Sequence, residues 1–210
     1  MRQIKEYITE RLKISSDLTR NNYKYFPKTK DELVQILEEL LKERGPNADL
    51  NDIDTSKIKD MHSLFSYIDV KIRNIDISQW NVSNVESMSD MFFGCEEFNC
   101  DLSQWDVSSC KNMYGMFYFC KKFDSDLSQW DVSNVEDLGA MFAYCENFNS
   151  NISRWNVSRC ENMANMFIKC KKFSQDLNRW KVDKVNSFKD MFIYSKMKKD
   201  NDLPFWYNNI

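Results

Sequence analysis

Residues 101–150 are two consecutive copies of one 25-residue unit, DLSQWDVSSCKNMYGMFYFCKKFDS followed by DLSQWDVSNVEDLGAMFAYCENFNS. The unit continues on both sides of this stretch, where tryptophan keeps the same spacing of 25: Trp80, Trp105, Trp130, Trp155 and Trp180. A fixed period between about 20 and 50 residues is typical of repeat architectures, in which each unit buries its apolar face against its neighbours. The 210 residues, 42% of them apolar, suffice for one elongated core.

Each unit reads as two structural halves. Leu102, Trp105 and Val107 match the strand core of a leucine-rich repeat, and the spacing of two places Trp105 and Val107 on one face of a short strand. From Cys110 to Phe123 the apolar residues are mostly three apart, which predicts a helical stripe. Capping boxes stand where these helices would begin: Ser83 with Glu86, Ser133 with Glu136, and Ser158 with Glu161. The unit is therefore predicted to be one strand followed by one helix.

The predicted fold class is α/β: a right-handed leucine-rich-repeat-like solenoid with a helical N-terminal cap. Parallel strands are expected at residues 80–82, 105–107 and 130–132. We place the cap at residues 1–49 and the repeat domain at residues 50–210, with five full units, a degenerate first unit and a partial last one. In the cap, a first helix is predicted over residues 4–12. A second is predicted from Asp31 to Arg44, with a capping box at Thr29 and a stop at Gly45.

Cysteine and histidine usage bears on chemistry. The seven cysteines are odd in number, and Cys110 and Cys160 occupy a slot that other units fill with valine, which predicts buried free thiols. Cys100 stands in an otherwise polar slot and is expected to react first. The single histidine, His62, is predicted to lie on the surface. The sequence predicts no catalytic residue, no metal site and no cofactor, and hence a protein that is not an enzyme.

Net charge changes sign along the repeat. Residues 76–150 carry 13 acidic and 3 basic side chains, whereas residues 151–200 carry 5 acidic and 12 basic ones. In a stack of units this becomes a charge step along the axis. It is either the drift of a solvated surface or a graded docking surface that orients a partner.

The residues from Asp101 to Ser108, followed by Met113, Met116-Phe117, Cys120 and Phe123, resemble the BspA-like leucine-rich repeat family of bacterial surface proteins. The resemblance covers residues 50–210. It implies a binding or adhesion module without enzymatic activity, and members of that family are often secreted or anchored. The N-terminus lacks the apolar stretch of a signal peptide, so we expect a cytoplasmic protein, with the cell surface or secretion as the alternative that the family implies.

The leading functional prediction is protein–protein interaction through the residues that flank each predicted strand, with a partner that the sequence does not identify and no membrane span. We call these ten residues the flank row: Gln79, Asn81, Gln104, Asp106, Gln129, Asp131, Arg154, Asn156, Arg179 and Lys181. One alternative is nucleic-acid binding through the basic C-terminal repeats, near Lys169, Lys171, Lys172, Lys196, Lys198 and Lys199. Another is a purely structural scaffold.

Overall fold

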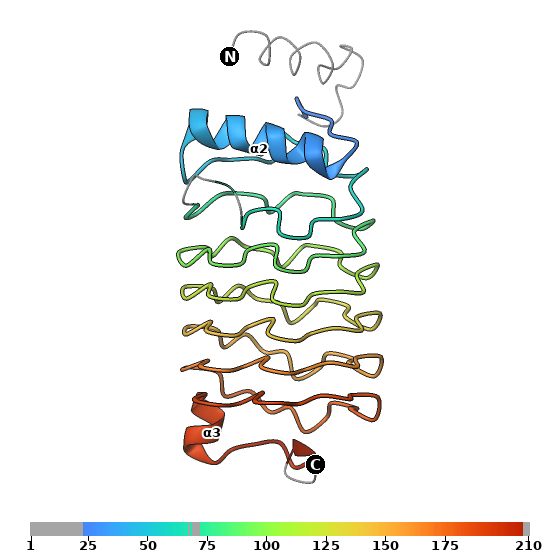
Figure 1. The fold of residues 1–210 in the computed structure, drawn as a ribbon, viewed down its shortest axis with the longest axis vertical. Helices are drawn as coiled ribbons and strands as arrows, with labels where there is room; N and C mark the ends of the chain where they lie inside the picture. Colours follow the sequence, from blue (N-terminus) through green and yellow to red (C-terminus); the bar gives the residue numbers. More distant parts are fainter. Residues whose placement is uncertain (1–22, 67, 69–71, 208–210) are drawn as a thin grey trace.

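The computed structural model describes residues 23–66, 68 and 72–207. Two helices lie within them, α2 (Lys30–Arg44) and α3 (Lys196–Asp200). Between these helices the chain winds through successive coils that stack along one axis (Figure 1). We use the word coil for one such 25-residue circuit. The helix predicted at residues 4–12 lies outside the described residues.

Helix α2 forms where the capping residues predicted it. The Thr29 side chain accepts a hydrogen bond from the Glu32 N–H at 3.2 Å, and the Glu32 carboxylate accepts one from the Lys28 N–H at 2.7 Å. The helix ends at Gly45, whose φ of 82° suits glycine. Its buried face consists of leucine and isoleucine side chains: Leu33, Ile36, Leu37, Leu40 and Leu41. The predicted second helix is therefore confirmed, and it packs its apolar side onto the first coil.

Within each coil the backbone is a chain of tight turns. The Trp105 N–H donates to the Leu102 carbonyl at 3.1 Å, and the Cys110 N–H donates to the Val107 carbonyl at 2.9 Å. The Met116 N–H closes the next turn on Met113 at 3.2 Å. A hydrogen bond between residues three apart is the bond of a β-turn. Apolar residues three apart are therefore the first and last residues of a turn, and both face the core.

Backbone hydrogen bonds also join each coil to the next. In one coil, four N–H groups donate to carbonyls of the following coil at 2.8–3.0 Å, namely those of Met113, Gly115, Phe117 and Phe119. Three others donate to the preceding coil, those of Lys111 at 2.9 Å, Asn112 at 3.4 Å and Lys122 at 3.0 Å. The forward bonds outnumber the backward ones, so the peptide dipoles of these stacked segments do not cancel.

The pairing between coils reduces to single parallel bridges. They link one residue per coil in a continuous column: Asp60, Ser87, Asn112, Asp137, Asn162 and Ser187. The strands predicted at 80–82, 105–107 and 130–132 are absent, because the chain turns at those tryptophans and the bridges lie several residues later.

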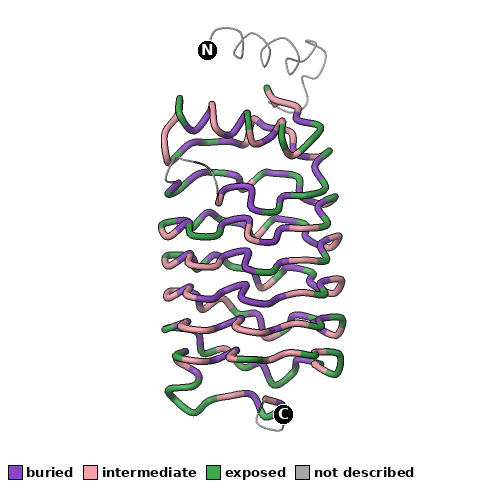
Figure 2. Tube along the Cα trace, in the orientation of Figure 1, coloured by how far each residue is buried: buried purple, intermediate pink, exposed green. Residues whose placement is uncertain are grey.

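The core consists of columns of identical side chains along the stack. Phenylalanine rings from consecutive coils stack at centroid distances of 5.2–5.9 Å: Phe65, Phe92, Phe117, Phe142, Phe167 and Phe192. Trp105, Trp130 and Trp155 are each only 4% exposed, which confirms their predicted burial. Figure 2 shows buried and exposed positions alternating along every coil. The periodicity thus specifies what is buried.

The predicted fold class is nonetheless wrong. A right-handed leucine-rich-repeat-like solenoid requires a strand and a helix in each unit, and the coils of the described residues contain neither. The serines of the capping boxes do not begin helices; Ser83 instead donates its N–H and hydroxyl to the Asn81 side chain, which closes a local turn. The division into residues 1–49 and 50–210 stays a prediction.

Candidate functional site

The flank row is exposed at all ten positions and forms two columns beside the tryptophan column. The tryptophans behind it are fixed by hydrogen bonds between coils. The Trp130 Nε1–H donates to the Leu102 carbonyl at 3.0 Å, and the Trp155 Nε1–H donates to the Leu127 carbonyl at 3.0 Å. The row therefore rests on a rigid support, although that support is a corner of turns and not the predicted strand face.

One column of the flank row also has a local structural role. The Asp106 carboxylate accepts hydrogen bonds from the Ser108 N–H at 3.1 Å and from its hydroxyl at 2.6 Å. Asp131 accepts equivalently from the Ser133 N–H at 3.0 Å, and hydrogen bonds from the Ser133 hydroxyl and N–H lower the Asp131 pKa. The turn therefore sets the orientation of both carboxylates. They present fixed negative charge to the solvent.

Charge changes along the row as the sequence analysis anticipated. The first coil offers the neutral Gln79 and Asn81, and the central coils add Asp106 and Asp131. The later coils carry Arg154, then Arg179 with Lys181. The structure places this sequence of charges on one continuous corner of the stack.

A second surface was missed by the sequence analysis. We call it the aromatic stripe, and it consists of Phe93, Tyr118, Phe119, Tyr144 and Lys169. The Phe93 and Tyr118 rings lie 5.1 Å apart, the Phe119 and Tyr144 rings 4.2 Å apart, and the Lys169 ammonium lies 4.6 Å from the Tyr144 ring centre. Phe93 is 40% exposed and the others are partly exposed. The stripe runs across four consecutive coils, about half a coil along the chain from the flank row.

The backbone under the stripe is left-handed. Phe119, Tyr144 and Lys169 have φ values of 63°, 62° and 58°, in a column that begins with Gly94 at 76°. A side chain in this conformation costs roughly 1–2 kcal/mol relative to glycine. The fold alone would accept glycine at every one of these positions. The aromatic side chains are therefore not explained by the needs of the backbone.

A third surface is a column of alternating charge. A groove of about 560 Å³ is lined by Lys59, Glu86, Lys111, Glu136 and Arg159, among others. The Lys111 ammonium lies 3.0 Å from the Glu86 carboxylate, and that hydrogen bond lowers the Glu86 pKa. Exposed pairs of this kind contribute little to stability, and the lowered pKa of Glu86 is the opposite of what a general acid needs. The groove is best described as a solvated ion-pair ladder.

The basic end of the chain gathers around α3. A groove of about 660 Å³ is lined by Tyr194, which is 75% exposed, and by the lysines at positions 171, 196, 198 and 199. These are residues of the nucleic-acid alternative, and the fold brings them together.

The single histidine lies in a variable position of the coil, which holds Ser89 and Tyr114 in the next two coils. The exposed His62 ring places Nδ1 2.8 Å from the Ser89 hydroxyl and Nε2 3.1 Å from the Ser63 hydroxyl. Ser63 has a φ of 53°, but the equivalent residue of each later coil is left-handed too, so this is a property of the coil and not local strain at a nucleophile. Asp90 has a raised pKa because of burial, which the His62 charge opposes. The left-handed backbone of Ser63 therefore does not indicate a reactive site.

The cysteines are free and buried, as predicted. The Cys145 thiol hydrogen bonds to the Phe117 carbonyl at 2.9 Å, and burial raises its pKa well above the ordinary value. Cys100 is 8% exposed and its pKa is raised to about 11, mainly by burial. Among residues 23–66, 68 and 72–207, no group of three histidine, cysteine or carboxylate side chains is arranged to hold a metal ion.

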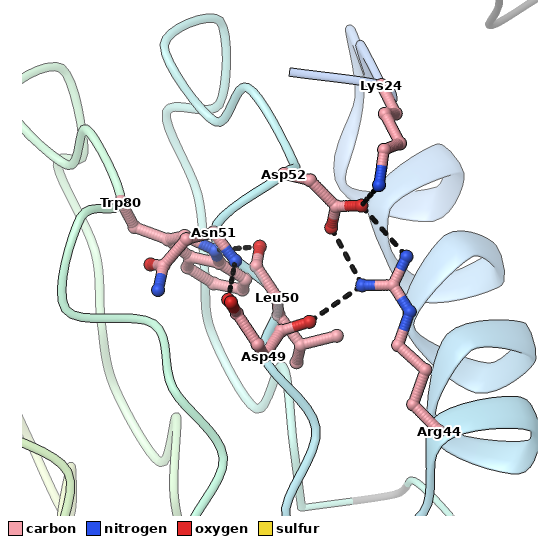
Figure 3. Close-up of polar contacts among 7 residues, drawn as sticks. All are labelled: Lys24, Arg44, Asp49, Leu50, Asn51, Asp52 and Trp80. Carbon is pink, nitrogen blue, oxygen red and sulfur yellow. Dashed lines mark hydrogen bonds and ion pairs between the residues drawn. The ribbon is translucent and has the colours of Figure 1, made fainter. Parts of the chain in front are cut away.

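A polar cluster joins α2 to the first coil (Figure 3). The Asp52 carboxylate receives both guanidinium nitrogens of Arg44 at 2.8 Å, and Lys24 at 3.2 Å. Burial alone would raise the Asp52 pKa, but the hydrogen bonds from Arg44 and Lys24 outweigh it and lower that pKa. Arg44 also donates to the Asp49 carbonyl at 2.6 Å. The cluster anchors the helix to the first coil.

These features define a protein built of 25-residue coils with an invariant core and variable surface columns. The chain belongs to the family described as "Mycoplasma protein of unknown function, DUF285", whose model matches residues 35–143 and 123–207. No curated protein and no solved structure matches the chain.

The family match corrects the resemblance to BspA-like leucine-rich repeat proteins. The matching family is a different one, and the described coils lack the strand of a leucine-rich repeat. The assignment as a leucine-rich-repeat solenoid of a bacterial surface-protein family is therefore wrong. The shared Trp, Val and Met-Phe spacing reflects buried columns, which turns can supply as well as strands and helices can.

Proposed function

We propose that this protein is a non-catalytic scaffold that binds a protein partner through the flank row. The proposal rests on the difference between the buried and the exposed residues at that corner. Behind it the tryptophan column is constant, while the ten exposed residues change from neutral to acidic to basic.

Rigidity supports this function. The tryptophan hydrogen bonds fix the corner from behind, and local turns orient Asp106 and Asp131. A surface that is already ordered loses little conformational entropy when it binds. Fixed charges of opposite sign at the two ends steer a partner and set its direction along the stack.

The absence of enzymatic activity is part of the same proposal, since a catalytic pair of carboxylates would depart from the structural repeat, whereas carboxylates such as Asp106 and Asp131 recur with it. No helix in residues 23–66, 68 and 72–207 is long and apolar enough to cross a membrane. The cytoplasmic location stays a prediction, with the cell surface as its alternative.

Site-specific photo-crosslinking tests the flank row directly. A benzophenone amino acid is placed singly at Gln104, Gln129 or Arg154, and at Glu136 on the ion-pair ladder as an exposed control. The protein is expressed in its native host and irradiated. We expect one common crosslinked protein from the three flank positions and none of that protein from Glu136.

Charge reversal then separates a specific contact from chance proximity. Combining the probe at Gln129 with Asp106→Lys and Asp131→Lys is expected to reduce the crosslinked product by about tenfold, because like charges at an interface slow encounter. Equal capture from Glu136, or capture indifferent to both reversals, contradicts the proposal and leaves a purely structural scaffold.

Nucleic-acid binding is a second candidate because the fold gathers Lys171, Lys196, Lys198 and Lys199 in one groove with Tyr194. Lysines that neutralise phosphates release counterions, so such binding weakens steeply with salt. Titration of a labelled uridine oligonucleotide at several salt concentrations measures this. Binding that disappears in Lys196→Glu with Lys198→Glu, and is retained in Asp106→Lys, supports the second candidate over the first.

A further inference from the structure

The aromatic stripe is a surface separate from the flank row, and it calls for an occupant of its own. We propose that it is a self-association surface on which two copies of this chain pair antiparallel. The two-fold axis lies between the coil of Phe119 and the coil of Tyr144. Each stripe then covers the other, with the first of its four coils opposite the fourth and the second opposite the third.

The apolar part of the argument is the continuity of the stripe. Aromatic rings contact one another from coil to coil at 4.2–5.7 Å, and Phe93 remains 40% exposed at one end. Aromatic side chains are enriched at protein interfaces because they bury a large area at low entropic cost. Phe119 and Tyr144 occupy left-handed positions that glycine would fill without strain. Burial in a dimer offsets that cost.

The charges beside the stripe determine which occupant fits. Two residues after each left-handed position, successive coils carry alternating signs: Glu96 with Glu97, then Lys121 with Lys122, then Glu146, then Lys171 with Lys172. A two-fold interface brings the same patch of both subunits together, so it must be complementary to itself. In the antiparallel pairing the acidic first coil faces the basic fourth coil, and the basic second coil faces the acidic third coil. A shift of one coil would oppose like charges.

Some of these charges are already paired within the chain. Glu96 lies 2.9 Å from Lys121, and Glu146 lies 2.8 Å from Lys171. Glu97, Lys122 and Lys172 are exposed and take no ion pair within the part of the chain that the structure describes. The proposed pairing places Glu97 of one copy near Lys172 of the other. It also places Lys169 opposite Phe93, which is a cation–π arrangement.

The same charges argue against a nucleic acid on the stripe. A nucleic acid carries uniform negative charge and binds basic tracks. The stripe begins beside Glu96 and Glu97 and has Glu146 at its third coil. A second copy, with its alternating signs reversed in direction, matches this pattern over these four coils. The left-handed column continues beyond them at Tyr194, whose ring centre lies 5.8 Å from the Lys169 ammonium and which stays outside the paired region.

The test is a charge swap followed by analytical ultracentrifugation of the full chain. Wild type is expected to show a dimer whose population rises with concentration. Glu97→Lys places lysine opposite Lys172 at both ends of the dimer, and Lys172→Glu places glutamate opposite Glu97. Each variant alone is expected to dimerise about tenfold more weakly. An equimolar mixture is expected to recover wild-type affinity, because each new charge then meets its opposite.

Two further variants test the aromatic contribution and the folding of the protein. Tyr144→Asn removes a ring while keeping a residue that tolerates a left-handed backbone, and it is expected to weaken the dimer by tenfold or more. Phe205→Ala is the matched control, since that side chain is 62% exposed but lies outside the stripe, and it should leave the dimer unchanged. Unchanged far-ultraviolet circular dichroism and melting of the charge variants establish that they fold.

The possible outcomes decide the proposal. A wild-type protein that stays monomeric at all concentrations overturns it, as does a dimer that Tyr144→Asn does not weaken or a mixture that does not recover affinity. A labelled uridine oligonucleotide whose binding requires Tyr144 would assign the stripe to nucleic acid and also overturn it. Asp106→Lys with Asp131→Lys should leave the dimer intact, so failure of the flank-row proposal and failure of this one are distinguishable.

Discussion

Replacing Trp130 with alanine tests whether the columns between coils hold the stack together. Trp130 is 4% exposed, its ring centre lies 6.4 Å from that of Phe117, and its Nε1–H donates to the buried Leu102 carbonyl at 3.0 Å. Truncation of a buried aromatic side chain costs about 3–5 kcal/mol. Leaving the carbonyl unpaired adds about 1 kcal/mol or more. We therefore expect a loss near the top of that range, about 4–5 kcal/mol.

Urea titration of three variants separates these contributions. Trp130→Phe keeps an aromatic ring but removes the N–H donor and the volume of the five-membered ring, so it should cost less than Trp130→Ala and at least the ~1 kcal/mol of the lost hydrogen bond. Trp206→Ala removes a side chain from the last coil, where the ring stacks on Trp180 at 6.5 Å and is 7% exposed. With one neighbouring coil in place of two, its loss should stay below about 3 kcal/mol. Equal losses for Trp130→Ala and Trp206→Ala would refute the reasoning.

Three other outcomes follow from local geometry and ionisation. Gly115→Ala should cost about 1–3 kcal/mol in urea titration, because the φ of Gly115 is 59° and an added Cβ would lie 2.3 Å from an Asp90 oxygen. Gly94→Ala is the control: an added Cβ there meets no atom within 4 Å, so the change should cost only about 1 kcal/mol. The pKa of Asp52 is lowered in the folded protein, so the carboxylate stabilises the fold at pH values above its ordinary pKa of 3.8, and this stabilisation is lost as the pH falls through the lower folded pKa. Asp52→Asn should therefore make the free energy of unfolding depend less on pH between neutral pH and about pH 3. Cys100 should react with a thiol reagent before Cys145, whose pKa burial raises further, and mass mapping showing the reverse order would contradict this.

The sequence predicted what is buried better than how the backbone buries it. The spacing of 25 identified the tryptophan column, and the slot shared with valine identified the thiols as small buried groups. Thr29 and Gly45 located α2 because capping depends on local hydrogen bonds alone. These features rely on short-range chemistry or on periodicity, both of which are visible in one chain.

The backbone of the coils was predicted wrongly because two structures share one pattern. Met113, Met116, Phe117 and Cys120 have the spacing of a helical stripe, and successive β-turns produce the same spacing. The signal that separates them lies at the column of Gly115. Its equivalents are residues that tolerate a left-handed backbone in most coils: Asp90, Asn165 and Asp190, with Ser63 and Ala140 as the exceptions. A helix does not require a residue that tolerates a left-handed backbone at a fixed interior position.

The aromatic stripe was missed for a related reason. The helix predicted from Cys110 to Phe123 spans Phe119, and in a helix that residue would not stand out from the apolar Met-Phe pair beside it. Once the backbone is known, Phe119 and Tyr144 are both seen to occupy left-handed positions at the surface. The flank row was placed correctly on the exposed side, since exposure next to a buried tryptophan follows from alternation in a turn as it does in a strand.

The direction of the backbone hydrogen bonds bears on the meaning of the charge step. Forward N–H donors outnumber backward ones in each coil, so the stacked peptide dipoles have their positive end toward the C-terminus. Stability alone would favour acidic side chains at that end, as it does at a helix N-terminus. The chain has the opposite arrangement, with 12 basic residues in 151–200 and 13 acidic ones in 76–150. Side-chain charge therefore adds to the backbone dipole and works against the isolated monomer. In the proposed antiparallel pair the backbone dipoles and the charge steps of the two copies run in opposite directions, so each copy would offset part of the other's cost.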